Sequence, residues 1–240
     1  EQHHFQIRKR TLEYDDVMNK QREILYGFRN QIINGDDVRD ELMDTMEAIV
    51  VEKIEEHVSQ EGEGEEFWTL RGLADWVNLN FPLGVEEDDL RRTAREATET
   101  PPADSSLAYM SAAQYALFVS VTGQVRDAYG VKVQVELDTA ATDEERELKS
   151  ATVTAMERMT MLTAIDKLWR EHLYTMDSLR HSIGLRAYGQ KDPLIEYKVE
   201  AKQIFDEMMA NIRTEICHNI YRSASSIEAI NTFLHDVKTM

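Results

Sequence analysis

The chain is poor in cysteine, proline and glycine. Its 240 residues include one cysteine, four prolines and ten glycines. A single cysteine, Cys217, excludes an intrachain disulfide and fits a reducing compartment. The small number of prolines and glycines argues against a turn-rich β fold. No apolar run approaches the ~20 residues that a membrane-spanning helix needs, and no signal peptide is visible.

Basic residues and phosphate-binding motifs are also scarce. The net charge is -18, which argues against nucleic acid as the main partner because phosphate contacts need clustered lysine and arginine. The sequence has no P-loop and no Gly-x-Gly-x-x-Gly run. Its histidines lack the spacing of a zinc site. We therefore expect no catalytic residue, no metal and no cofactor within this chain.

What the sequence does contain is helical periodicity. An apolar seam with alternating spacings of three and four comprises Leu162, Ile165, Trp169, His172, Met176, Leu179 and Ile183. This heptad pattern predicts a helix that packs along another helix. A second seam comprises Tyr197, Ala201, Ile204, Met208, Ile212, Ile216 and Ile220. The pair predicts an antiparallel two-helix finger with its tip at residues 184–193, within an all-α fold of long scaffold helices.

The patterns divide the whole chain into four predicted parts. Residues 1–59 form the first part of the scaffold, with a long helix that ends at Asn34-Gly35 and a second helix after it. Residues 60–145 form a small helical wing that begins with a polar linker. Residues 146–223 complete the scaffold, and residues 224–240 form an amphipathic tail.

The end of the wing allows two interpretations of its secondary structure. A helix is expected from about residue 108 to residue 129. Residues 130–138 alternate between apolar and polar side chains, which fits either a strand or a continued helix. Asp143 is expected to cap the helix that follows.

The seam contains two residues that could carry chemistry. His172 is interpreted as a packed, hydrogen-bonded core histidine rather than a ligand or base, and Trp169 as a core residue rather than a stacking platform. A helical enzyme with a site around His172 and Asp177 is kept as an alternative. Asp15 and Asp16 either form an exposed acidic turn that pairs with nearby basic residues or provide a docking surface.

The tip of the finger has turn chemistry and an aromatic side chain. Gly184 weakens the helix before the turn, Gly189 can take a positive φ, and Pro193 fits the first turn of the next helix. Tyr188 lies between them with few residues available to bury it. It is a candidate contact residue, unless it folds back onto the finger.

Two long motifs together resemble a known family. Residues 5–22 (FQIRKRTLEYDDVMNKQR) and 24–29 (ILYGFR) resemble the start of the helical scaffold of SecA, the ATP-driven motor of bacterial preprotein export. Residues 165–173 (IDKLWREHL) and matching positions between 176 and 198 resemble its two-helix finger. The segment between them resembles the family's helical wing in position and aromatic content.

The resemblance implies a piece of a longer protein, since the chain opens on Glu1 in an apparent helix. In the family, nucleotide-binding motor domains that use ATP and Mg²⁺ precede this segment, and a zinc-binding cysteine-rich tail follows it; both are absent here. The long scaffold helix contacts the motor domains, and the finger enters the SecYEG channel and touches the preprotein. By position, the implied motor-docking residues are Tyr14, Asp15, Asp16 and Arg22. The implied residues for channel and polypeptide contact are Leu185, Arg186, Tyr188 and Lys191.

The function that the resemblance implies is mechanical. The segment would couple ATP hydrolysis in the missing domains to preprotein movement through SecYEG, at the cytoplasmic face of the plasma membrane. It would not hydrolyse ATP by itself. The longer protein could also form a homodimer, which the sequence does not decide. The alternative is a stand-alone helical adaptor that binds proteins without a motor; nucleotide-binding motifs encoded upstream of Glu1 would exclude it.

Overall fold

The structure is a computed structural model that describes residues 2–35, 37–58, 67–183 and 192–223. Within these ranges the chain forms helices and no strand, which confirms the all-α prediction. The helices are α1 (Gln2–Asn34), α2 (Val38–His57), α3 (Leu70–Asn80), α4 (Glu87–Arg95), α5 (Ala112–Asp138), α6 (Asp143–Ile183) and α7 (Pro193–Ile220). The polar linker and the amphipathic tail that we predicted lie outside the described residues.

The helices group into two compact units. Unit 1 comprises Glu1–Val38 and Arg158–Ile212, and unit 2 comprises Arg39–Glu157 and Arg213–Met240. The long helices α6 and α7 each contribute residues to both units. In this grouping α2 belongs with the segment that we predicted to be a wing, whereas the wing's own boundaries near residues 60 and 145 stay a prediction.

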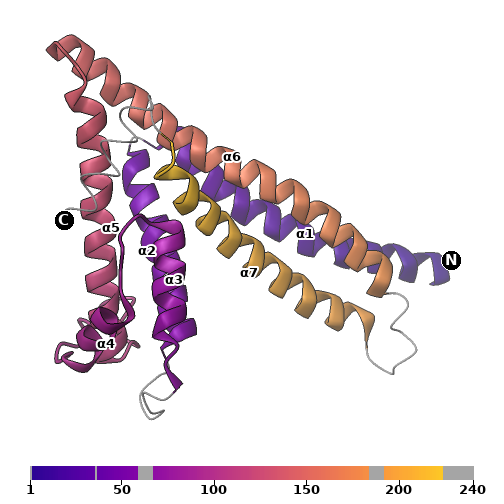
Figure 1. The fold of residues 1–240 in the computed structure, drawn as a ribbon. Helices are drawn as coiled ribbons and strands as arrows, with labels where there is room; N and C mark the ends of the chain where they lie inside the picture. Colours follow the sequence, from indigo (N-terminus) through magenta and orange to yellow (C-terminus); the bar gives the residue numbers. More distant parts are fainter. Residues whose placement is uncertain (1, 36, 59–66, 184–191, 224–240) are drawn as a thin grey trace. The chain divides into compact units, whose positions relative to one another are not determined.

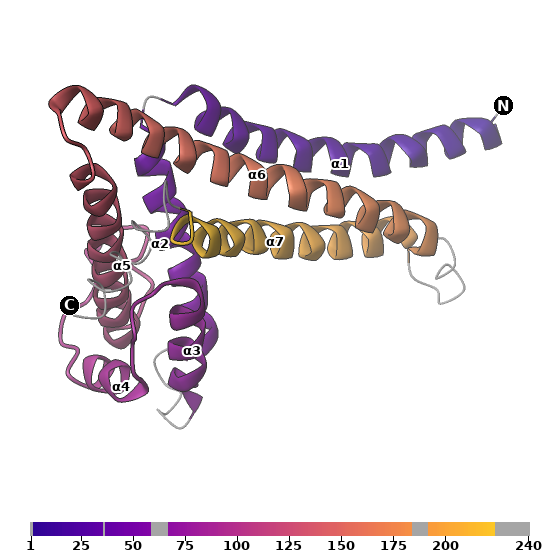
Figure 2. The same cartoon turned by 45° about the horizontal axis from the view of Figure 1, so that its top comes forward.

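Unit 1 is a bundle of three long helices. The helix α1 runs beside α6 in both views (Figures 1 and 2), and it contacts α7 through the hydrogen bond from Gln21 to Ala201. Both predicted seams lie on the buried sides of their helices. All seam residues are buried except Leu162 and Ile204, which are half-buried. On α1 the buried stripe follows Gln21, Leu25 and Ile32 at helical spacing, whereas Ile24 is 57% exposed.

Gly35 ends α1, as its sequence predicted. Its backbone N–H donates to the carbonyl oxygen of Gln31 at 2.7 Å. A Cβ atom at this position would come within 2.5 Å of that same oxygen. Glycine therefore allows the chain to close the last turn of α1 tightly before α2 begins.

Unit 2 packs around the apolar face of α2. The buried residues of that face are Val38 at its start, then Leu42, Met46, Ile49, Val50, Ile54 and Val58. Phe81, just after α3, contacts Trp76 and Tyr221 edge to face, with ring centroids 5.8 and 5.7 Å apart. Two large apolar side chains of the same segment, Phe67 and Leu79, are 64% and 61% exposed.

The helix α5 resolves the alternative left open at residues 130–138. These residues continue the helix, since Tyr129, Lys132, Val133 and Glu136 are buried at helical spacing, and this periodicity outweighs the apparent alternation. The helix begins at Ala112 rather than near residue 108. Ser111 accepts from the backbone N–H of Gln114, and the Gln114 side chain accepts from the Ser111 N–H, which is a capping box.

The expected cap of α6 is wrong by one residue. The hydroxyl oxygen of Thr142 accepts from the backbone N–H of Glu145 at 3.2 Å, and the Glu145 carboxylate accepts from the N–H of Ala141 at 2.7 Å. Asp143 is consequently the first residue inside the helix. Its negative charge still lies near the positive end of the helix dipole, which favours a helix start.

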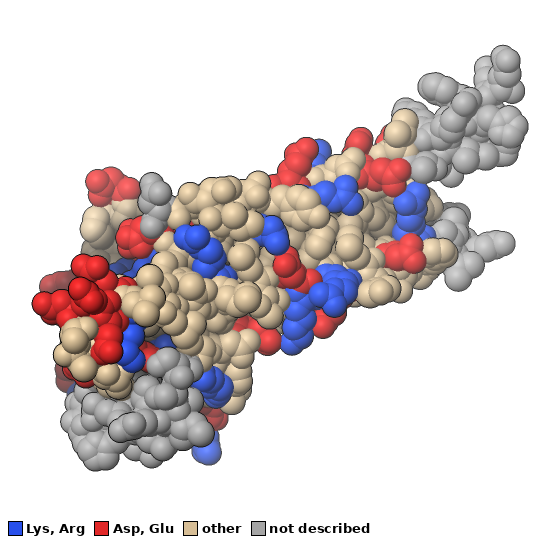
Figure 3. Space-filling model, turned by 90° about the horizontal axis from the view of Figure 1, so that it is seen from above, with Lys and Arg blue, Asp and Glu red and all other residues tan. Residues whose placement is uncertain are grey.

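Charged side chains of both signs are spread over the surface. On the face drawn in Figure 3, the basic side chains of the described residues are interspersed with acidic and uncharged ones, and acidic side chains gather at one end. This distribution fits the acidic balance of the whole sequence.

Candidate functional site: the anchored end of the helical finger

The connection between α6 and α7 is where the sequence predicts contact with a partner. The predicted contact residues Leu185, Arg186, Tyr188 and Lys191, and the predicted turn residues Gly184 and Gly189, lie outside the described residues. Pro193 is the first residue of α7, as predicted. Just before it, the Asp192 carboxylate accepts from the backbone N–H of Leu194 at 2.9 Å, so the start of α7 is fixed by a side-chain cap.

The ends of α6 and α7 next to this connection pack into one apolar cluster with α1. The buried residues of the cluster are Met176, Leu179, Ile183, Tyr197 and Ala201, and partly buried Tyr14, Val17, Met18 and Ile204 pack against them. The rings of Tyr14 and Tyr197 meet edge to face with centroids 4.7 Å apart. The finger is therefore held to α1 close to its tip as well as along its length.

An ion pair flanks the tyrosine contact. Arg180 of α6 donates to the Asp15 carboxylate at 3.0 Å, and its guanidinium carbon lies 5.9 Å from the ring centre of Tyr14. Both charged side chains are more than 40% exposed, so solvent screens the pair and its stabilisation is small. The partner of Asp15 is thus far away in the sequence rather than among the nearby basic residues.

These contacts separate the predicted motor-docking residues into two groups. Tyr14 and Asp15 face α6 and α7 inside unit 1. Asp16 and Arg22 are exposed, and Arg22 donates to Asn19 on its own helix at 3.2 Å. Docking of a motor domain on this helix stays a prediction, with Asp16 and Arg22 as its accessible members.

A polar layer crosses the bundle one to two turns further along. The side-chain amide of Gln21 donates to the carbonyl oxygen of Ala201 at 2.9 Å, and its oxygen lies 2.9 Å from Nε2 of His172. Gln21 is 5% and His172 3% exposed. This confirms that His172 is a packed, hydrogen-bonded core residue, and its burial lowers its pKa to about 4.

Trp169 is a core residue, as interpreted from the seam. It is 8% exposed and stacks on His172 with ring centroids 5.3 Å apart, while Tyr26 meets it edge to face at 6.4 Å. Beside it, Arg29 of α1 pairs with Asp166 of α6 at 3.0 Å. The contact between α1 and α6 thus includes apolar, aromatic and ionic layers in succession.

The alternative of a catalytic site at His172 and Asp177 is not assembled. The imidazole of His172 is buried and directed at Gln21, whereas the Asp177 side chain is 72% exposed beside His181 of its own helix. Among the described residues, no cluster of three or more His, Cys, Asp or Glu side chains could hold a metal ion. No helix in the described ranges is long and apolar enough to cross a membrane.

Unit 2 holds a buried ionic network that the sequence analysis missed. The carboxylate of Glu157 is 1% exposed and accepts from the Tyr129 hydroxyl and, at 2.9 Å, from Nε of Arg39. Burial, together with the nearby Glu157 carboxylate, raises the pKa of Tyr129. Lys132 is also buried, and this burial lowers its pKa. The available signal was two charged residues, at 132 and 136, inside an otherwise apolar helical stripe.

The profile of the SecA wing and scaffold domain matches residues 1–224, which is nearly the whole chain. The chain belongs to the SecA wing and scaffold family. The finger, the long helix beside it and the small helices of unit 2 are therefore parts of that family's wing and scaffold.

Individual relatives agree with the family assignment. The chain is similar to protein translocase subunit SecA of Heliobacterium modesticaldum, with 33% identity over 222 residues that cover 92% of this chain and 22% of that protein. The SecA subunit of Pelotomaculum thermopropionicum is 36% identical over 224 residues, with the same coverages of 92% and 22%. That of Cutibacterium acnes is 34% identical over 218 residues, 90% of this chain and 20% of its own length. The chain thus spans about a fifth of the length of these relatives.

Proposed function

We propose that this chain is the transmission part of an ATP-driven preprotein translocase. Nucleotide-binding domains elsewhere in the protein would bind ATP and Mg²⁺ and move against α1. The finger formed by α6 and α7 would carry that motion to the residues that connect them. Those residues would contact the mouth of the SecYEG channel and the polypeptide inside it, at the cytoplasmic face of the plasma membrane.

One observation carries the proposal: α1 is fastened to the finger at several levels by specific contacts. The Tyr14–Tyr197 ring contact lies next to the tip, and the Gln21–His172–Ala201 hydrogen bonds follow one to two turns away. The Arg29–Asp166 pair lies further along α1. Because packed interiors deform little, a displacement of α1 in this arrangement would move α6 and α7 with it.

The predicted tip residues suit a contact that is independent of sequence. An aromatic ring such as Tyr188 offers a large apolar surface and a polar hydroxyl, so it can contact many different side chains. Arg186 and Lys191 add hydrogen-bond donors, and Leu185 adds apolar surface. This combination fits a passing polypeptide better than one fixed ligand.

The test compares alanine variants of two tyrosines in the full-length translocase: Tyr188, in the connection after α6, and Tyr174, in α6 itself. Tyr188→Ala is expected to slow the transport of a preprotein into reconstituted SecYEG vesicles while basal ATP hydrolysis stays near the wild-type rate. Tyr174→Ala is the matched control, because Tyr174 is 73% exposed on the side of α6 and its loss should change neither rate. Equal transport rates for Tyr188→Ala and wild type would refute the contact role, and loss of basal ATP hydrolysis in Tyr188→Ala would refute a purely mechanical one.

A further inference from the structure

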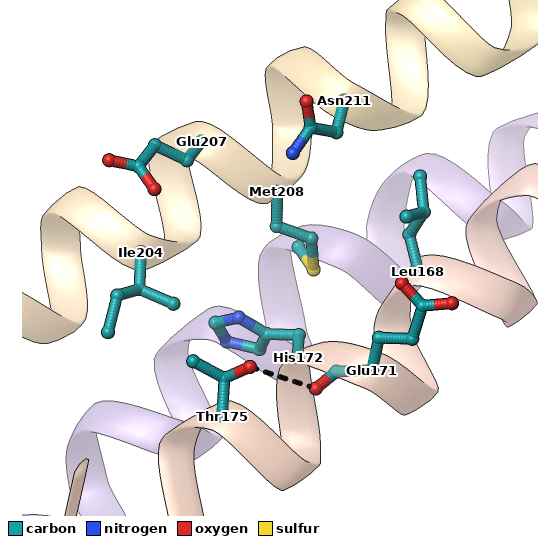
Figure 4. Close-up of a pocket in the computed structure, with 8 residues that line it drawn as sticks. All are labelled: Leu168, Glu171, His172, Thr175, Ile204, Glu207, Met208 and Asn211. Carbon is teal, nitrogen blue, oxygen red and sulfur yellow. Dashed lines mark hydrogen bonds between the residues drawn. The ribbon is translucent and has the colours of Figure 1, made fainter. Parts of the chain in front are cut away.

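A groove opens between α6 and α7 beside the polar layer. Its volume is about 190 Å³, and its lining includes Ile204 and Met208 as apolar wall, Glu171 and Glu207 as carboxylates, and His172. Figure 4 shows these side chains on the facing sides of α6 and α7, with the imidazole of His172 in the space between the two helices. All of its lining residues belong to unit 1.

The hydrogen bonds of the polar layer determine which nitrogen of His172 carries the proton. The Gln21 amide donates to the Ala201 carbonyl, which can only accept, so the amide oxygen of Gln21 faces His172. An amide oxygen cannot donate, and therefore Nε2 of His172 must carry the hydrogen. A neutral imidazole with a proton on Nε2 has a lone pair on Nδ1.

That lone pair is an unused acceptor. Nδ1 of His172 is buried and has no hydrogen-bond partner among the described residues. A buried acceptor without a donor is unfavourable, and most such groups in proteins find a partner. The groove beside it is large enough for a group that brings a donor. Met208 is the neighbour best able to move aside, because its side chain is unbranched and adaptable.

The charge of the groove selects the kind of donor. Glu171 and Glu207 both line it, and no lysine or arginine is among its lining residues. The Glu207 carboxylate accepts from the side-chain amide of Gln203 at 3.0 Å, and a neutral amide does not cancel its negative charge. Carboxylates favour a cation, the lone pair of Nδ1 favours an N–H group, and Ile204 and Met208 favour an apolar stem.

We propose that the groove binds a guanidinium or ammonium group on a short apolar stem, with an N–H donated to Nδ1 of His172. The carboxylates of Glu171 and Glu207 balance the cation, and Ile204 and Met208 contact the stem. Such a group is found on arginine and lysine side chains of polypeptides and on free alkylamines. The site is separate from the predicted tip contacts and does not depend on the proposed transport function.

The test follows the methyl signal of Met208 in carbon NMR while n-butylguanidinium is added to the 240-residue chain. We expect a saturable shift with a Kd of about 1 mM, which is typical for so small a ligand. Tetramethylammonium has the same charge without an N–H and should bind at least about tenfold more weakly. In a sample with labelled histidine, Nδ1 of His172 should shift in parallel with the Met208 methyl group.

Variants separate the two parts of the site. His172→Phe keeps an aromatic ring but removes the acceptor, and the double variant Glu171→Gln/Glu207→Gln removes both charges on the surface without disturbing the core. Each should weaken binding about tenfold or more, whereas Glu147→Gln, an exposed carboxylate of α6 outside the groove, should leave it unchanged. If His172→Phe does not fold, the surface double variant still decides the question.

A second ligand identifies the source of the cation. A blocked tripeptide, acetyl-Ala-Arg-Ala-amide, that binds more tightly than butylguanidinium would indicate a polypeptide segment, and equal affinity would indicate a free small cation. The proposal is overturned if no ligand gives a saturable shift, so that the groove holds only water, or if the charge-removing variant binds as tightly as the wild type.

Discussion

The buried imidazole of His172 should make the stability of unit 1 depend on pH above the range in which carboxylates titrate. Its ordinary pKa is 6.5, and burial lowers the pKa in the folded chain to about 4. Above pH 6.5 the imidazole is neutral in both the folded and the unfolded state. Below that pH the imidazole of His172 is protonated in the unfolded chain but stays neutral in the folded chain down to about pH 4. The free energy of unfolding therefore falls as the pH falls through this window.

The size of the effect follows from the difference in pKa. A lowering from 6.5 to about 4 corresponds to roughly 3 kcal/mol once the full window has been crossed. Between pH 7 and pH 5 the same linkage gives a loss of about 2 kcal/mol. Most carboxylates remain ionised above pH 5, so His172 should dominate the change in this range.

The assay is urea unfolding followed by the fluorescence of Trp169, which stacks on His172. Replacing Trp68 and Trp76 with phenylalanine leaves Trp169 as the only tryptophan and restricts the signal to unit 1. Unfolding of this chain and of its His172→Phe variant is compared at pH 7 and pH 5. The variant is less stable at pH 7, because it leaves the Gln21 oxygen unpaired, but its stability should change little between the two pH values.

The comparison of slopes decides the outcome. A loss of about 2 kcal/mol in the chain with His172 and little loss in the variant supports a buried neutral imidazole. Equal slopes in the two proteins would refute it, because the pH dependence would then arise elsewhere. A histidine NMR titration that places the pKa of His172 near 6.5 would refute it independently.

Two further predictions concern unit 2. Tyr129→Phe removes the hydroxyl that donates to the buried Glu157 carboxylate, so it should lower the free energy of unfolding by about 2 kcal/mol. The control Tyr115→Phe, at a half-buried position of the same helix, should change the free energy of unfolding by less than about 0.5 kcal/mol. Equal effects of the two variants in calorimetry would contradict this prediction. Cys217 is fully buried, and its burial raises the pKa of the thiol, so an aromatic disulfide reagent should label it only in denaturant; rapid labelling of the folded chain would contradict its placement in the core.

The finger was predictable because its signal is local and repeated. Heptad spacing predicts the buried side of each helix without reference to its partner, and only Leu162, at the start of the first seam, and Ile204, within the second, are half-buried rather than buried. On α1 the pattern was broader, and two neighbouring residues, Ile24 and Leu25, competed for the buried position.

The networks were not predictable, because their members are far apart in the sequence. Gln21 and His172 are separated by 151 positions, and Arg180 and Asp15 by 165. Each residue alone is also compatible with an exposed position or with a local ion pair. The same holds for Glu157, whose partners Tyr129 and Arg39 come from two other segments.

The sequence by itself determined that this chain is helical, that it contains a long antiparallel finger and which family it resembles, because periodicity and family motifs are properties of short contiguous segments. Only the tertiary structure decided that α1 is fastened to the finger by Tyr14 and Gln21, and that Nδ1 of His172 lies buried beside a groove without a hydrogen-bond partner among the described residues. Those features depend on which side chains from different helices meet, and on how far water is excluded where they do.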